Sequence, residues 1–340
     1  MLPRLAAGVA ILGTALVVQA GAASLEPKDF VHWKLPEHVP EPVGNQSTAA
    51  RVELGSMLFF DPRFSSNGNM SCASCHNPSL GWSDGLDTAV GHNGKKLGRA
   101  TPTVMNSGYY TIFMWDGRKA SLEDQAVGPM QSADEMRADW PRTFALLSGT
   151  PAYVQAFSKA YPGEPIDERT FAKAIAAFER TVVTRDSDFD RWLAGDKTAM
   201  SERANRGLAL FVDPAKGNCA GCHAAPNFSD SGFHNVGLAS FGAAEADLGR
   251  YNERRVALMK GAFKTPQLRD IARTAPYFHD GSAKTLRDVV EHYRRGGEVK
   301  TNLSPDLKPL NLTDQECEEL VAFLEALTSN GPPFRAPHLP

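Results

Sequence analysis

The chain has 340 residues, and its 36 Lys and Arg against 39 Asp and Glu give a formal net charge of -3 at pH 7. This balance leaves no basic footprint for nucleic acid and excludes a protein built to bind it. With 42% hydrophobic and 22% charged residues the composition is that of a globular protein, and the length suits two domains.

The N-terminus carries an export signal. Arg4 precedes an apolar run from Leu5 to Val18, and the small residues Ala20, Gly21 and Ala22 follow it. This pattern predicts a cleaved signal peptide over residues 1–22. The run is shorter than the roughly twenty residues that a bilayer span needs, which disfavours the alternative of an uncleaved anchor. We therefore expect a periplasmic protein with no membrane span after cleavage.

Two CxxCH motifs, at Cys72–His76 and Cys219–His223, are the main chemical feature. The pattern attaches a c-type haem, because its two thiols add to the haem vinyl groups while the following His turns to the iron. Zinc or dithiol chemistry is the alternative, but structural zinc sites rarely place His directly after the second Cys in both halves. The sequence predicts two covalently bound haem c groups, held by Cys72, Cys75, His76, Cys219, Cys222 and His223.

The two halves repeat one plan. Gly55–Pro62 and Gly207–Pro214 share the pattern GxxLFxDP before their CxxCH motifs. Further matches lie 164 residues apart, among them Trp115–Gly117 with His279–Gly281. The repeat predicts a mainly α fold of two cytochrome c-type domains with long loops around two haems. We expect an N-terminal domain over residues 23–190, a C-terminal domain over 191–330 and an irregular tail over 331–340.

Each unit should end in an amphipathic helix. Apolar residues recur with helical spacing from Phe171 to Val182 and from Leu320 to Leu327. Thr313 and Glu316 form a capping box at the start of the second of these helices. Cys317 falls on its apolar face, which favours a buried free thiol over a reactive one.

The two haem sites differ in their far-side residue. Leu286, Val290 and Tyr293 share one face of a predicted helix, so Tyr293 can reach the iron opposite His223. The alternative is a core tyrosine whose hydroxyl bonds a propionate or a carbonyl. The first unit has Pro129 at the corresponding position, which cannot ligate iron and should break the helix there. The first haem thus lacks its sister's ligand.

The chain resembles the bacterial dihaem cytochrome c peroxidases and their MauG-type relatives. The match runs from about Gly55 to Leu327 and is carried by the CxxCH pair and by the motifs at Met114–Arg118, Leu122–Met130 and Thr274–Gly281. The resemblance implies a peroxidatic haem at the first CxxCH motif, hydrogen peroxide as substrate, and Trp115 as an electron conduit between the haems.

The resemblance also places Gln125 and Glu135 in the distal pocket of the first haem, where the acid assists peroxide deprotonation and O–O cleavage. The chemistry supports this independently, since cleavage needs a proton moved between the two oxygens, which a nearby carboxylate can do. The alternative is that Glu135 is a solvated charge beside Asp134.

His92 follows His76 by sixteen residues, the spacing at which dihaem peroxidases carry a displaceable distal ligand. Gly91 and Gly94 would let its loop swing, although a surface histidine is the alternative. MauG-type relatives generally lack this ligand, and they carry Tyr where the peroxidases carry Met. His92 and Tyr293 therefore make this chain a hybrid of the two patterns.

The family also binds calcium between its domains. The backbone carbonyls of Thr274 and Pro276 fit that pattern, but the Asn that supplies the side-chain ligand is replaced by Ala100. With one oxygen lost, we expect weakened calcium binding unless water substitutes. Both residues are otherwise simply turn residues.

An anionic Tyr293 ligand would stabilise higher oxidation states of iron and make the second haem a poor entry port for electrons. We therefore predict a MauG-like enzyme that shares oxidising equivalents through Trp115 and oxidises a Trp or Tyr side chain of a periplasmic partner protein. The first alternative is a peroxidase fed by a small cytochrome c or cupredoxin. The second is a non-catalytic dihaem electron carrier with His92 permanently bound.

Overall fold

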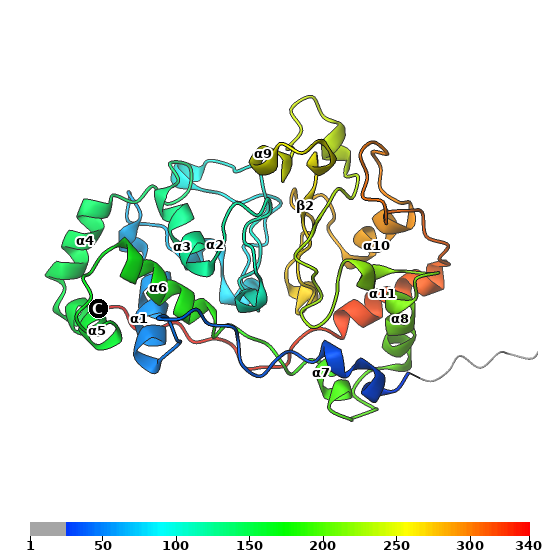
Figure 1. Cartoon of the computed structure of the whole chain (residues 1–340), viewed down its shortest axis with the longest axis horizontal. Coiled ribbons are helices and arrows are strands. Elements are labelled where there is room, and N and C mark those ends of the chain that lie inside the picture. The colour runs from blue at the N-terminus through cyan, green and yellow to red at the C-terminus, as the bar shows by residue number, and fades with distance from the viewer. Residues whose placement is uncertain (1–24) are drawn as a thin grey trace, which may run out of the picture.

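A computed structural model describes residues 25–340. It is mainly helical, as predicted, with two lobes that follow the order of the chain (Figure 1). In the described residues the strands are limited to the short antiparallel pair β1 and β2. The helices are α1 (Ala49–Phe60), α2 (Cys72–Cys75), α3 (Leu122–Gln131), α4 (Trp140–Gly149), α5 (Pro151–Ala160), α6 (Glu168–Glu179), α7 (Asp188–Leu193), α8 (Glu202–Val212), α9 (Tyr251–Arg254), α10 (Leu286–Arg294) and α11 (Asp314–Glu325), and the strands are β1 (Phe233–His234) and β2 (Phe263–Lys264).

The same helix crossing supports both lobes. In the first, α1 packs on α6, and in the second, α8 packs on α11. A glycine makes each crossing possible: a Cβ on Gly55 would lie 1.9 Å from the carbonyl oxygen of Ala174, and one on Gly207 would lie 1.9 Å from that of Glu319. Any larger residue would force the helices apart. The internal repeat is therefore a repeat of packing as well as of sequence.

The loops repeat as well. Met114 and Phe278 adopt left-handed backbone conformations with φ of 68° and 67°, and Asn106 and Asp270 do so with φ of 56° and 58°. Each pair is separated by the offset of 164 that aligns the sequence motifs. Because non-glycine residues rarely adopt this conformation, its recurrence shows that the two loops follow the same path.

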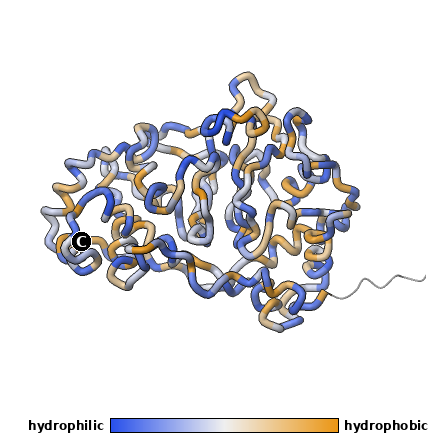
Figure 2. The backbone as a smooth tube through the Cα atoms, in the orientation of Figure 1, coloured by the Kyte–Doolittle hydropathy of each residue, from blue (hydrophilic) through white to orange (hydrophobic). Residues whose placement is uncertain are grey.

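The described residues form two large hydrophobic cores, one in each lobe, and a small third cluster of Phe113, Leu122 and Ala176; apolar residues are spread over both lobes rather than gathered in one (Figure 2). The first core includes Leu58 and Phe178, and the second includes Leu208 and Phe323. The predicted capping box of Thr313 and Glu316 is confirmed at the start of α11. Cys317 is fully buried there as a free thiol, also as predicted.

The ends of the chain cross between the lobes (Figure 1). Phe30 and Trp33, which the predicted boundaries place in the first domain, lie in the core of the second. In return, Phe334 of the irregular tail packs on Phe60 and Trp82 of the first lobe, with ring centroids 5.4 and 4.9 Å apart. The domain boundaries drawn in chain order are therefore wrong for the N-terminal segment, whose aromatic side chains are buried by a distant part of the chain.

The predicted break at Pro129 is also wrong, because α3 continues through Pro129 to Gln131. The proline lies near the C-terminal end of the helix, where it removes one backbone hydrogen bond and leaves the remaining turn intact. None of the described helices is long and apolar enough to cross a membrane. The predicted signal peptide, residues 1–22, lies outside the described residues.

Candidate haem cavity

A single cavity between the lobes is lined by residues of both units. The first unit contributes His76, Trp115 and Gln125, and the second contributes His223 and Tyr293. The structure thus brings together the histidines of both CxxCH motifs, which lie 147 residues apart in the sequence. A cavity that reaches both motifs is what two haem groups in electronic contact require.

The two motif histidines are oriented in the same way. Nδ1 of His76 lies 3.2 Å from the carbonyl oxygen of Trp82, and Nδ1 of His223 lies 3.0 Å from that of Phe228. Trp82 and Phe228 both have left-handed backbones, with φ of 58° and 54°, which set these carbonyls. Because a carbonyl only accepts, Nδ1 carries the proton and Nε2 remains free to bind iron. Burial lowers the pKa of both imidazoles and so favours the neutral, ligating form.

The four motif thiols are partly buried and unpaired. Burial raises the pKa of Cys75 to about 11 and that of Cys219 to about 12. Unmodified thiols at Cys75 and Cys219 would therefore be protonated and unreactive at neutral pH, unlike those of dithiol redox motifs, whose pKa is lowered. The environment fits cysteines that are consumed by covalent attachment.

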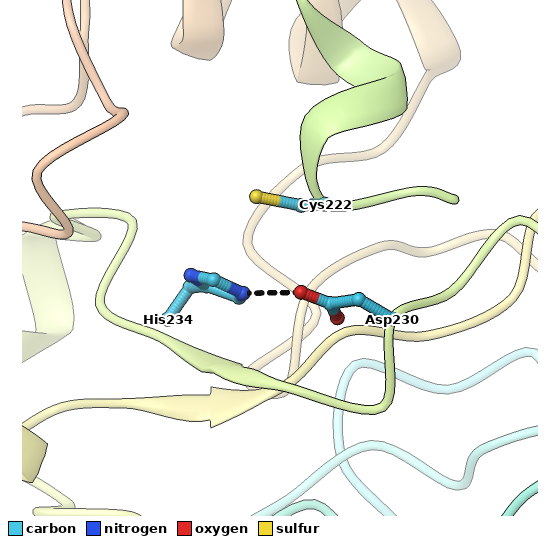
Figure 3. Close-up of side chains that lie close together, drawn as sticks. All are labelled: Cys222, Asp230 and His234. Carbon is cyan, nitrogen blue, oxygen red and sulfur yellow. Dashed lines mark hydrogen bonds and ion pairs between the residues drawn. The ribbon is translucent and has the colours of Figure 1, made fainter.

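Cys222 also lies beside Asp230 and His234 (Figure 3). His234 Nε2 donates to Asp230 Oδ2 over 2.8 Å, and this hydrogen bond is the main reason that the pKa of His234 rises to about 10. The trio has metal-ligand chemistry, but a protonated imidazole does not bind metal, and Cys222 is the second cysteine of its CxxCH motif. The arrangement places a cation at the second attachment site instead.

The surroundings of Lys264 indicate that the cavity suits an anionic group. It is 8% exposed, its Nζ lies 3.5 Å from the ring centroid of Tyr110, and its hydrogen bond to the Thr265 carbonyl is long, at 3.4 Å. Among the described residues no carboxylate forms an ion pair with it, and burial lowers its pKa to about 7. A buried ammonium is costly unless an anion accompanies it. The propionates of a haem would supply such an anion, so the donor set fits the group.

Trp115 lies where the two units meet. Its Nε1 donates to the carbonyl oxygen of Ala100 over 2.8 Å, and its own carbonyl accepts from the backbone of Lys264 over 2.8 Å. Its ring centroid lies 6.4 Å from that of His279, the residue at the corresponding position of the second unit. Trp115 is therefore held at the junction by contacts to both units.

Tyr293 lines the cavity from α10, together with the apolar side chains of Leu286 and Val289. Its neighbour His292 is directed elsewhere, with Nε2 2.8 Å from the carbonyl oxygen of Val236. Burial raises the pKa of the Tyr293 phenol, and the charges of the Cys219 and Cys222 thiolates would raise it further, which places Tyr293 close to the second motif. A bound cation reverses this preference, because coordination stabilises the anionic ligand.

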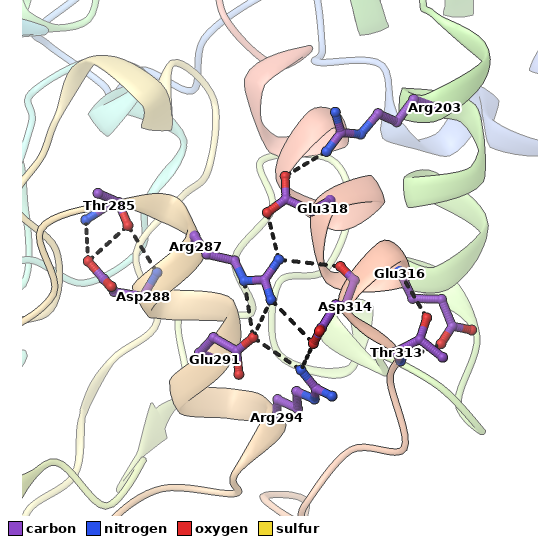
Figure 4. Close-up of polar contacts among 10 residues, drawn as sticks. All are labelled: Arg203, Thr285, Arg287, Asp288, Glu291, Arg294, Thr313, Asp314, Glu316 and Glu318. Atoms are coloured by element: carbon purple, nitrogen blue, oxygen red, sulfur yellow. Dashed lines mark hydrogen bonds and ion pairs between the residues drawn. The ribbon is translucent and has the colours of Figure 1, made fainter.

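Ion pairs fix α10 against α11 (Figure 4). The Arg287 guanidinium bonds Glu291 and Glu318, each at 2.6 Å, and Arg294 bonds Asp314 at 2.6 Å. A single exposed ion pair contributes little to stability, but several pairs that share partners can hold α10 in a fixed position against α11. This network limits the freedom of the helix that presents Tyr293.

The remaining distal candidates divide into two groups. Gln125, on α3, lines the cavity, whereas Glu135 and His92 do not. The backbone of His92 contacts the residue before Glu135: the His92 amide donates to the Asp134 carbonyl over 2.9 Å, while His92 Nδ1 lies 3.2 Å from Ser66 Oγ. Burial raises the pKa of the half-buried Glu135, and its charge in turn raises that of Cys75, so Glu135 lies near the first motif.

Thr274 and Pro276 line the same cavity. Ala100 is 7% exposed, and both of its backbone groups are used, since its amide donates to the His279 carbonyl over 2.7 Å and its carbonyl accepts from Trp115. Ala100 thus offers no side-chain oxygen to a cation, and its carbonyl oxygen already accepts one hydrogen bond. Weakened calcium binding at Thr274 and Pro276 stays a prediction.

Sequence reasoning missed two buried charged residues of this cavity, Lys264 and Glu179. The burial of Glu179 could in part have been inferred from the sequence, because this residue directly follows Phe178 in a helix whose apolar face includes Ile175. The burial of Lys264 had a weaker signal, its place just before the repeated Thr-Pro pair.

Fold and cavity together define a class: two cytochrome c-type units around a shared cavity suited to two haems. Comparison with known families agrees. The model of the di-haem cytochrome c peroxidases matches residues 49–198, and the cytochrome c model matches residues 204–328.

The curated relatives include the methylamine utilization protein MauG of Methylorubrum extorquens, 43% identical over 97% of this chain and 92% of the relative. The cytochrome c551 peroxidase of Pseudomonas aeruginosa is 36% identical over 90% of this chain and 86% of its own. Among solved structures, a MauG-like protein associated with microbial copper homeostasis is 32% identical, with a TM-score of 0.82 over 88% of this chain and 95% of that one.

The chain belongs to the dihaem cytochrome c peroxidase and MauG family. It is accordingly an oxidoreductase of the dihaem peroxidase class that carries two haem c groups, which confirms the predictions of the family, of the enzyme class and of the two haems.

Proposed function

We propose that this protein reduces hydrogen peroxide at the haem of the Cys72–His76 motif and uses the oxidising equivalents to oxidise a partner protein in the periplasm. The observation that carries this proposal is Tyr293, a buried phenol that faces the cavity beside the second CxxCH motif. The first unit has Pro129 in its place, and its haem would be open to peroxide. The identity to MauG proteins is consistent with a MauG-like function.

When bound, the haems supply the electron transfer chemistry and the iron that binds the small substrate. The chain's part begins with His76 and His223, which offer Nε2 while their Nδ1 atoms are held by backbone carbonyls. Cys72, Cys75, Cys219 and Cys222 would fix the two groups covalently, and Lys264 would neutralise a propionate.

Glu135 would move the proton of the substrate. Burial raises its pKa, so it is a stronger base than an exposed carboxylate, and the positive charge of Arg118 limits the shift. A carboxyl with a pKa closer to neutral accepts a proton and returns it more readily. Gln125, on the cavity wall, would orient the substrate with its amide.

Trp115 would carry oxidising equivalents between the haems, supported by its fixed place at the junction of the two units. The Tyr293 phenolate would disfavour reduction of the second haem by an external carrier. Together the two residues favour an oxidised state of the protein that is long-lived and that is reduced only when it slowly oxidises a partner protein.

The second candidate function is a cytochrome c peroxidase that receives electrons from a small cytochrome c or cupredoxin. The contact of His92 with the turn that carries Glu135 favours it, because a distal ligand would have to come from that side. If His92 is a displaceable ligand, the oxidised protein should react with peroxide only after one-electron reduction, and His92→Gly should react without it.

Rapid mixing of the haem-loaded protein with peroxide separates the two functions. The MauG-like function predicts that the oxidised wild type reacts at once and that both haem spectra stay changed for minutes without a partner. Tyr293→Met should shorten that lifetime and change the low-spin EPR signal of the second haem. An unchanged EPR signal would mean that Tyr293 is a core residue that does not bind the iron, and it would contradict the proposal.

A further inference from the structure

Glu179 is a buried acid that the chemistry above does not use. It is the last residue of α6, is 3% exposed and lines the haem cavity. Its Oε2 is buried without a hydrogen-bond partner. The adjacent Arg180 forms no hydrogen bond with it: its Nη2 bonds both carboxylate oxygens of Glu123, at 2.9 and 3.0 Å, and its Nη1 is also buried without a hydrogen-bond partner. Such an orphan carboxyl calls for an explanation.

The internal repeat provides a comparison. The glycine of α1 packs on Ala174 and Phe178, and the glycine of α8 packs on Glu319 and Phe323 in the same way. Glu179 therefore corresponds to Leu324, which follows Phe323 and lines the same cavity. An apolar side chain thus satisfies the packing at this position, and the acid is particular to the first unit.

The surroundings of Glu179 favour its neutral form. Burial raises its pKa, the charge of Arg180 opposes this, and the charge of Glu123 on α3 adds to it, so that the pKa of Glu179 lies at about 8. The Cys72 thiol of α2 lies close enough for the charge of Glu179 to raise its pKa, but attachment of a haem would turn that thiol into an uncharged thioether. From α1, the contact with this end of α6 comes from the apolar ring of Phe59.

We propose that Glu179 couples a proton to the redox state of the first haem. The carboxyl holds its proton while that haem is reduced. When the haem gives one electron to an acceptor, such as a mediator in solution or Trp115 during turnover, the O–H bond of the carboxyl breaks and its proton leaves to water. The carboxylate then balances the added positive charge. The proposal rests on the proposed attachment of a haem at Cys72–His76.

This coupling has a defined signature. One proton is released per electron between the pKa of the oxidised form and that of the reduced form, so the potential of the first haem falls as pH rises. The equilibrium constant changes tenfold per pH unit there, which is about 59 mV for a one-electron couple. The second haem, with Leu324 at this position, should lack this contribution, so any slope that it shows should be the same in Glu179→Gln and Glu179→Leu as in the wild type.

Spectroelectrochemical titration of the haem-loaded protein between about pH 6 and pH 9 measures it, since the raised pKa falls in this range. The wild type should show the slope for one haem, and Glu179→Gln and Glu179→Leu should flatten it. Glu53→Gln, which removes an exposed carboxyl from α1, should leave the slope unchanged. A flat wild-type potential, or a wild-type slope kept in Glu179→Gln, overturns the proposal.

If the variants lose haem, infrared difference spectra of the wild type decide instead. Oxidation of the first haem should remove the C=O band of one protonated carboxyl, and the absence of that loss overturns the proposal. Neither experiment uses peroxide or a partner protein, so its failure is separate from failure of the proposed function. Mass spectrometry of the haem peptide after Cys72→Ser, which should show one thioether in place of two, tests the attachment itself.

Discussion

Trp115→Phe should separate electron transfer between the haems from the integrity of the fold. The substitution removes the 2.8 Å hydrogen bond from Nε1 and leaves the buried carbonyl of Ala100 without that donor. A lost buried hydrogen bond of this kind costs about 1–3 kcal/mol. Since domains of this size are stable by about 5–15 kcal/mol, the variant should fold and load haem.

The assay adds one equivalent of peroxide and follows both haems by rapid-scan absorbance, with urea unfolding measured in parallel. If Trp115 is the conduit, the response of the second haem should lag that of the first at least tenfold more than in the wild type, a change of about 1.4 kcal/mol or more in the barrier. Trp140→Phe is the matched control, because its Nε1 has no partner and it packs in the first core away from the cavity. A second haem that responds in Trp115→Phe as fast as in the wild type would refute the conduit.

Three further results are expected. Cys72→Ser and Cys219→Ser should each leave one haem held by a single thioether, whereas Cys317→Ser should keep all attachments, as mass spectrometry of haem peptides can show. Glu135→Gln should slow the peroxide reaction by about 10²–10⁴-fold; in the wild type the rate should rise with pH through the raised pKa of that carboxyl, and a flat stopped-flow profile would remove Glu135 from the reaction. Gly207→Ala should lower the free energy of unfolding by at least about 1–3 kcal/mol in urea titrations, because the added Cβ would lie 1.9 Å from the Glu319 carbonyl oxygen, and an unchanged midpoint would contradict the close crossing of α8 and α11.

Local chemistry made part of the architecture predictable. The CxxCH motifs, the repeat and the capping box at Thr313 depend on neighbours in sequence, and the structure has the box and the repeated crossings as expected. The orientation of Tyr293 toward the cavity follows from the period of α10.

Features that depend on contacts between residues far apart in the sequence could not be predicted. Phe30 and Trp33 are buried by the second lobe, which no local pattern announces. The sequence predicts that Pro129 ends a helix, but a proline so near the C-terminal end of α3 removes only one backbone hydrogen bond, and the helix continues to Gln131. Glu179 and Lys264 look like surface charges in the sequence, and only the assembled cavity buries them.

The most direct test of the proposed function is steady-state oxidation of reduced cytochrome c by peroxide, compared between the wild type and Tyr293→Met. A phenolate at the second haem should make the wild type slow, and a thioether there should raise the potential of that haem and speed turnover. The proposed function predicts slow turnover by the wild type and a marked increase in the turnover rate in Tyr293→Met. Rapid, saturable turnover by the wild type, with no gain in the variant, would contradict it and favour a cytochrome c peroxidase.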